Sequence, residues 1–73
     1  MSAIPKHRRL LGDAIRAKRK KVCLTQEKLA EKSDLSTVFI SRVECAKESP
    51  TMDSLAKIAA ALQVSIRDLT RDF

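Results

Sequence analysis

The sequence predicts an all-α fold of five helices, and three observations support this class. Apolar residues recur at helical spacing, Ser or Thr residues stand where helices begin, and the chain has one Gly, two Pro and no Trp or Tyr. This composition disfavours a turn-rich β-sandwich or barrel. The 73 residues, 44% hydrophobic and 33% charged, predict one small globular domain over residues 1–73, with residues 8–70 as its ordered part.

The first predicted helix spans residues 8–20. Leu11, Ala14 and Ile15 begin an apolar pattern at helical spacing, which continues to Val22. Basic residues collect in the last turn, where they lie at the negative end of the helix dipole. The first helix therefore has an apolar face toward the core and a basic C-terminal end.

The second and third helices are predicted from their capping residues. Thr25 caps a short helix in which Leu29 and Ala30 face inward. Ser36 caps the next helix, which runs to about position 45. Two short helices joined by a turn of about three or four residues are typical of a helix-turn-helix, here over residues 25–45.

A proline separates the last two helices from the rest. Pro50 holds the residue before it extended, so the fourth helix begins at Thr51. Ser65 and Asp68 match a capping box for a short fifth helix. Because helices of these lengths are unstable alone in water, they must share a core. The predicted core residues are Leu11, Ile15, Leu29, Leu35, Ile40, Val43, Leu55, Ile58, Ala59, Leu62 and Leu69.

The net charge of +6 is placed unevenly. Residues 1–21 hold eight Lys or Arg against Asp13 alone, whereas residues 22–73 are close to neutral. A basic end on a near-neutral body indicates a polyanion partner, either nucleic acid or an anionic membrane surface. The alternative is a solvated basic helix that binds nothing. A membrane partner is disfavoured, because the first helix has no aromatic anchor and the longest apolar run has five residues.

Catalytic and metal chemistry is not indicated. Cys23, Cys45 and His7 are too few and too far apart to make a zinc site. The sequence has no nucleophile–base pair, Gly-rich phosphate loop or carboxylate couple. We therefore expect no enzymatic activity, no metal and no cofactor. Two Cys without a secretory signal fit a reducing cytoplasm.

The third helix can be oriented on Ile40, taken as the centre of its buried face. At about 100° per residue, three residues then point outward together, namely Val38, Ser41 and Arg42. Ser bonds several bases, Val meets a thymine methyl, and Arg grips guanine O6 and N7 with two hydrogen bonds. These residues are candidate base contacts, although Val38 alone would be an ordinary surface apolar residue. Phe39 is predicted to be partly buried, with its ring edge near the DNA backbone.

Gln26 lies in the first turn of the second helix, where free N–H groups and the helix dipole favour a phosphate. Its side-chain amide can bond a phosphate or brace the third helix. A merely solvated side chain is the alternative. Position alone leaves these three roles open.

Several stretches together carry a family resemblance. Thr-Gln-Glu-Lys-Leu-Ala at residues 25–30 and Ile-Ser-Arg-Val-Glu at 40–44 are the most specific, with further matches at residues 11–16 and 55–64. At this spacing they resemble the Xre-type helix-turn-helix family, which includes lambda-class phage repressors and the controller proteins of restriction–modification systems. The resemblance covers about residues 9–70 and implies a lambda repressor-like fold.

The resemblance also implies roles for individual residues. Arg19 and Glu44 match a structural ion pair between the first and third helices, which assigns Arg19 to the scaffold. Cys23, Asp34 and Ala46 stand at turn positions where the family often has Gly. A left-handed backbone there would cost about 1 kcal/mol for Cys or Ala. The residues that match DNA contacts are Gln26, Ser36, Thr37, Val38, Phe39, Ser41, Arg42 and, in the loop after the recognition helix, Lys47.

The predicted function is a sequence-specific DNA-binding transcriptional regulator, with a restriction–modification controller protein the closest match in length. One module reads only about four to six base pairs, so we expect a homodimer on a palindromic operator. RNA polymerase is a further candidate partner. The alternative is an antitoxin that represses its own operon, although the long tail that many antitoxins use is not seen. The predicted dimer surface lies on the last two helices, at Leu62, Val64, Ile66, Leu69 and Phe73.

Overall fold

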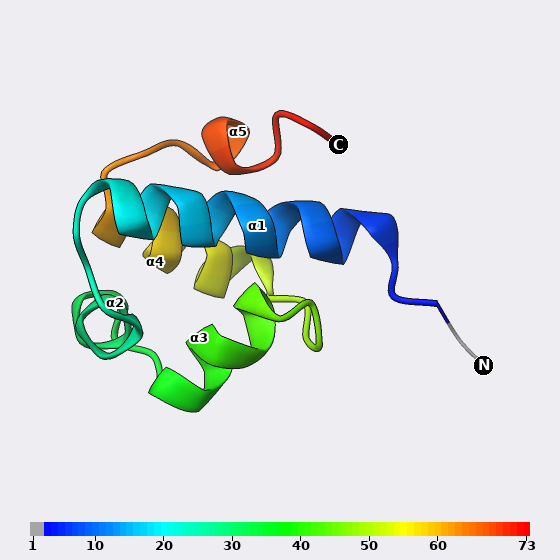
Figure 1. Cartoon of the computed structure of the whole chain (residues 1–73). Helices are drawn as coiled ribbons and strands as arrows, with labels where there is room; N and C mark the ends of the chain where they lie inside the picture. Colours follow the sequence, from blue (N-terminus) through cyan, green and yellow to red (C-terminus); the bar gives the residue numbers. More distant parts are fainter. Residues whose placement is uncertain (1–2) are drawn as a thin grey trace.

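The computed structural model describes residues 3–73, which form five α-helices and contain no strand. α1 crosses the molecule, with the short α5 on one side and α2 and α3 on the other (Figure 1). The predicted all-α, five-helix fold is therefore confirmed. The helices are α1 (Lys6–Lys21), α2 (Gln26–Ser33), α3 (Thr37–Glu44), α4 (Met52–Leu62) and α5 (Ile66–Leu69).

Hydroxyl side chains cap four of these helices. Thr25, Ser36, Thr51 and Ser65 each accept a hydrogen bond from a backbone amide three residues further on. Ser65 and the third residue of its helix form the predicted reciprocal capping box. α1 differs, because it follows Pro5, has no side-chain cap and has no acidic residue in its first turn.

The core lies between α1, the helix pair α2–α3 and the last two helices. Every predicted core residue except Leu35 is buried, and Leu35 packs half-buried against the same cluster. The largest side chains that are completely enclosed are Ile15, Leu29, Ile40, Val43, Ile58 and Leu69. The helical periodicity of the sequence therefore identified the inward faces of all five helices.

Gly12 sets how closely α1 approaches the end of α3. A Cβ atom at this position would lie 2.7 Å from the backbone oxygens of both Val43 and Glu44. No real side chain fits at that separation, so a glycine is required where the two backbones touch. The close approach fixes the C-terminal end of α3 against the longest helix of the fold.

The three turn positions where related proteins often have Gly keep a left-handed backbone. Cys23, Asp34 and Ala46 have φ values of 60°, 58° and 61°, and Gln63, which the sequence analysis missed, has 60°. In each turn the next amide reaches back to a carbonyl of the preceding helix at 2.9–3.0 Å, as Lys47 does to Arg42. These closing bonds offset the strain of about 1 kcal/mol that a non-glycine residue carries there.

The predicted dimer surface is wrong at two of its five residues. Leu62 and Leu69 are 2% and 1% exposed, because both point into the core of the same chain. Val64 and Ile66 are half-buried, and Phe73 is 59% exposed, with its ring 6.3 Å from that of His7. Of the five predicted residues, only Val64, Ile66 and Phe73 can offer apolar surface to a second chain.

Candidate nucleic-acid interface

The outer face of α3 presents the residues that the sequence analysis assigned to base contacts. Val38 is 69% exposed and the Arg42 side chain 50% exposed, whereas Ile40 is enclosed. Ser41 is half-buried, so it is less outward than its angle on the helix predicted. Phe39 is half-buried against the core, as expected.

Two polar residues stand at the start of α3. Ser36 and Thr37 are both exposed. The Ser36 hydroxyl accepts a hydrogen bond from the Phe39 amide at 3.0 Å, so its own proton remains available to donate outward. The N-cap residue of α3 therefore also places a hydrogen-bond donor at the N-terminal end of the helix.

Arg42 is held by a partner that the sequence analysis did not identify. Its Nε donates to Glu48 Oε1 at 3.0 Å, across the turn that follows α3. Nη1 and Nη2 make no hydrogen bond within residues 3–73. Those two nitrogens are the pair that a guanidinium can direct together at guanine O6 and N7. The sequence did not indicate the Arg42–Glu48 pair, because that pair depends on the left-handed turn at Ala46.

The inner face of α3 ends in a buried charged junction. The Glu44 side chain is completely enclosed, and Arg19 donates to both of its carboxylate oxygens, from Nε at 2.7 Å and from Nη2 at 3.0 Å. Arg19 also donates to the carbonyl of Leu24 at 2.9 Å. The ion pair that the resemblance implies is therefore present, and it joins α1 to α3 and to the turn before α2.

Two further residues converge on Glu44. Gln26 Nε2 donates to its Oε1 at 3.1 Å, which ties the start of α2 to the end of α3. Arg16 donates from Nη2 to the backbone oxygen of Glu44 at 2.8 Å and lies 3.7 Å from its carboxylate. Of the roles left open for Gln26, bracing α3 is the one seen in the free protein.

These contacts control the charge of Glu44. Burial acts to raise its pKa, but the hydrogen bonds from Arg19 and Gln26 and the charges of Arg19 and Arg16 act more strongly. The pKa of Glu44 therefore lies below its ordinary value. The hydrogen bond to Glu44 raises the pKa of Arg19. Both side chains are ionised at neutral pH, so α3 is anchored by a full ion pair.

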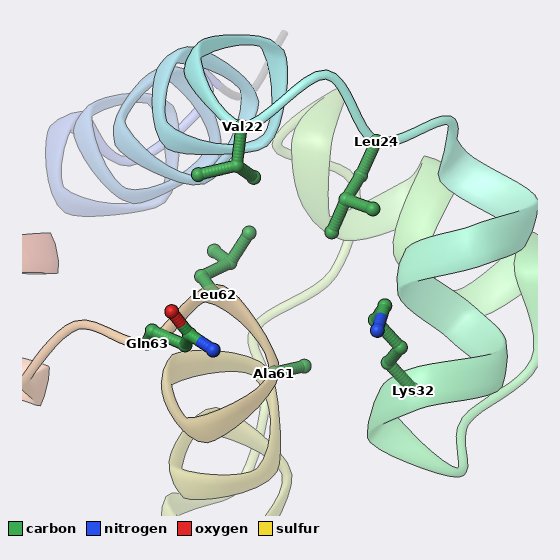
Figure 2. A pocket seen from close by; sticks show the side chains of 6 residues that line it. All are labelled: Val22, Leu24, Lys32, Ala61, Leu62 and Gln63. Atoms are coloured by element: carbon green, nitrogen blue, oxygen red, sulfur yellow. The ribbon is translucent and has the colours of Figure 1, made fainter.

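A small pocket is lined entirely by residues outside α3. With a volume of about 190 Å³, below the size of common ligand pockets, it lies between the end of α1, α2 and the end of α4. Figure 2 shows the side chains that line it. Val22 and Leu24 face Ala61 across it, and Lys32 is its single charged residue. Residues 3–73 also hold no group of three His, Cys, Asp or Glu able to bind a metal. None of their helices is long and apolar enough to cross a membrane.

The fold and the geometry of α2 and α3 define a helix-turn-helix domain. The family model described as "Helix-turn-helix" matches residues 15–69, and the chain belongs to this family. The family consists of DNA-binding transcription regulators and is not a class of enzymes. The resemblance to Xre-type, lambda repressor-like proteins is thereby confirmed.

A curated relative and two solved structures agree with this family. The uncharacterized HTH-type transcriptional regulator MT0491 of Mycobacterium tuberculosis is 39% identical over 54 residues, which are 74% of this chain and 39% of the relative. The chain spans about two fifths of the length of the curated relatives it matches.

The two structures share the arrangement of helices. The restriction–modification controller protein C.AhdI of Aeromonas hydrophila is 29% identical with a TM-score of 0.83, and the match covers 85% of this chain and 94% of that one. The P22 c2 repressor, solved in complex with synthetic operator 9T, is 33% identical with a TM-score of 0.79. That match covers 86% of this chain and 96% of the repressor.

Proposed function

We propose that this protein binds DNA sequence-specifically as a homodimer on a palindromic operator and regulates transcription there. One observation carries the proposal. α3 is fixed from its inner face by the enclosed Glu44. Its outer face presents Val38 and two nitrogens of Arg42 that make no hydrogen bond within residues 3–73. A rigid helix with exposed hydrogen-bond donors and an apolar side chain suits insertion into a major groove.

The assigned residues divide into base contacts and backbone contacts. Arg42 reads a guanine and Val38 a thymine methyl, with Ser41 between them on the helix. Ser36 and Thr37 occupy further reading positions at the start of α3, and the ring edge of Phe39 meets the sugar–phosphate backbone. Gln26 and Lys47 contact phosphates on either side, and Gln26 keeps its hydrogen bond to Glu44 in this arrangement. These assignments follow the exposure of each side chain and the family resemblance.

A dimer is needed because one recognition helix reads too few base pairs to select a site in a genome. Phe73, Ile66 and Val64 supply the apolar surface for it, now that Leu62 and Leu69 are assigned to the core. The fold shared with C.AhdI supports a controller protein as the particular kind of regulator.

The test is selection of binding sites from random DNA, followed by affinity measurements on the selected and scrambled sequences. We expect two-fold sites whose half-sites lie about 10–10.5 base pairs apart, and a dimer in sedimentation experiments. Arg42→Ala should weaken binding to the selected site by about 1–3 kcal/mol and relax one position in each half-site.

Arg67→Ala is the matched control, because Arg67 is exposed on α5 and carries the same charge. It should leave the base preference unchanged. If Arg42→Ala weakens selected and scrambled DNA equally, Arg42 contacts phosphate and does not read a base. Selection that yields no preferred sequence for the parent protein would refute the proposed function itself.

A further inference from the structure

A cleft of about 310 Å³ lies between the segment before α1 and the loop after α3. Both segments lie at the same end of the molecule, beside the C-terminal end of α3 (Figure 1). Three cationic side chains line the cleft, and its other lining residues are small or apolar. The cations are Arg8, Arg42 and Lys47, and the remaining residues are Ala3, Ile4, Pro5 and Ala46.

The charges around this cleft are not balanced by the protein. Glu48 pairs with Arg42 through Nε, but Arg8 and Lys47 form no ion pair within residues 3–73. Like charges that share a small space repel one another. An anion in the cleft would reduce this repulsion, so the lining favours a negatively charged ligand.

Arg8 is the cleft residue with a buried hydrogen-bond donor left unsatisfied within residues 3–73. Its Nε is buried and has no hydrogen-bond acceptor in the part of the chain that the structure describes. By contrast, Arg16 and Arg19 on the same helix donate to Glu44, and Arg42 donates to Glu48. A buried donor without an acceptor is unfavourable, and an oxyanion in the cleft would supply the missing acceptor.

The end of α1 adds to this preference. Pro5 lines the cleft and precedes the first residue of α1, which has neither a side-chain cap nor an acidic residue in its first turn. Within residues 3–73, neither a side-chain cap nor a first-turn carboxylate of α1 offsets the positive end of the helix dipole. That positive end acts in the same direction as the cleft's three side-chain charges.

We propose that this cleft binds a backbone phosphate of the DNA, with Arg8 and Lys47 as its two ligands. The inference rests on the proposed function, and it assigns a particular contact to Arg8, which the sequence analysis counted only as part of the basic end. A DNA phosphate is favoured over a free anion because the cleft shares Arg42 with the outer face of α3. The bound phosphate therefore flanks the bases that α3 reads.

The experiment combines arginine variants with modified DNA. Binding of the parent, Arg8→Ala and Arg9→Ala proteins is measured at several salt concentrations, on DNA in which single phosphates are replaced by neutral methylphosphonates. Arg9 is the matched control, because it is the exposed neighbour with the same charge. Thermal melting of all three proteins reports on stability.

The proposal expects one phosphate per half-site whose neutralisation weakens binding of the parent and of Arg9→Ala more than that of Arg8→Ala, in which Lys47 alone still contacts the phosphate. Arg8→Ala should also weaken selected and scrambled DNA alike and reduce the salt slope by about one ion per subunit. Its melting temperature should stay near that of the parent. Arg8→Lys should restore the salt slope, because it keeps the charge.

Two results would overturn the inference. Arg8→Ala could keep the parent's salt slope and its sensitivity to every methylphosphonate, or it could change melting alone, which would make Arg8 a structural residue. If Arg8→Ala does not fold, Arg8→Gln, which keeps an N–H group without the charge, gives the same comparison. A parent protein that prefers no DNA sequence would refute the proposed function, whereas a selective parent with an unaffected Arg8→Ala refutes only this cleft.

Discussion

The two faces of α3 are held in place by different physical means. On the inner face, Ile40 and Glu44 are at most 2% exposed, and the Glu44 carboxylate is held by donors from α1 and α2. On the outer face, Val38 is open to solvent and Arg42 has a single half-exposed partner. Exposed ion pairs contribute about 0–1 kcal/mol, so Arg42 can exchange Glu48 for another acceptor at little cost. The inner face fixes the helix, and the outer face stays free to bind.

The largest difference in stability should be seen between variants that remove the carboxylate bound at each face, Glu44 or Glu48. Glu44→Ala leaves the Arg19 guanidinium, largely buried, without its partner, and should lower the free energy of unfolding by about 3–5 kcal/mol. Glu48→Ala removes the partner of an exposed arginine and should change it by about 0–1 kcal/mol. Urea denaturation of both variants measures the difference. Equal losses would mean that Glu44 is not the anchor of α3.

An apolar pair on the same helix tests the comparison without any charge. Ile40 is 1% exposed, and Ile40→Ala should lower the free energy of unfolding by about 2–5 kcal/mol, because it removes enclosed methyl groups and leaves a cavity. Val38→Ala should change stability by only about 0.5 kcal/mol and should instead alter the base preference at one position. An Ile40→Ala protein that melts like the parent would show that the inner face has been misassigned.

Low pH should selectively weaken the ion pair between Glu44 and Arg19 on the inner face of α3. Because the pKa of Glu44 is lowered in the folded protein, the unfolded chain takes up a proton more readily, at the ordinary value of 4.5. The ion pair therefore contributes its full stability above pH 4.5 and loses it as the pH falls through the folded pKa. Denaturation midpoints measured below pH 4.5 should fall more steeply for the parent than for Glu44→Gln. Parallel curves would exclude Glu44 as the source of acid sensitivity.

The sequence predicted what depends on spacing and on local hydrogen bonds. The caps at Thr25 and Ser65 and the apolar periodicity are encoded within a few residues of chain, whereas the turn positions at Cys23 and Asp34 came from the family resemblance. The family resemblance supplied the ion pair of Arg19 with Glu44, which joins residues distant in the sequence. These features therefore appear both in the sequence and in the structure.

What the sequence did not predict depends on tertiary placement. The Arg42–Glu48 pair and the cleft beside Arg8 exist because the turn at Ala46 brings the loop after α3 against the segment before α1. Leu62 and Leu69 were assigned both to the core and to a dimer surface, and burial shows that they serve only the first. Helical periodicity identifies the apolar residues, but it does not distinguish those buried within one chain from those left for contact with a second chain.

The smallest expected effect concerns Lys47, which belongs to neither face of α3. It is exposed in the loop after the helix, so Lys47→Ala should leave the melting temperature unchanged. The loss of one phosphate contact should weaken all DNA sequences nearly alike and flatten the salt dependence by about one ion per subunit. Lys57→Ala, which removes an equally exposed charge from α4, is the control for net charge. Binding isotherms at several salt concentrations separate the two variants. If both flatten the slope equally, Lys47 acts through overall charge, and the backbone contacts lie only at residues closer to α3.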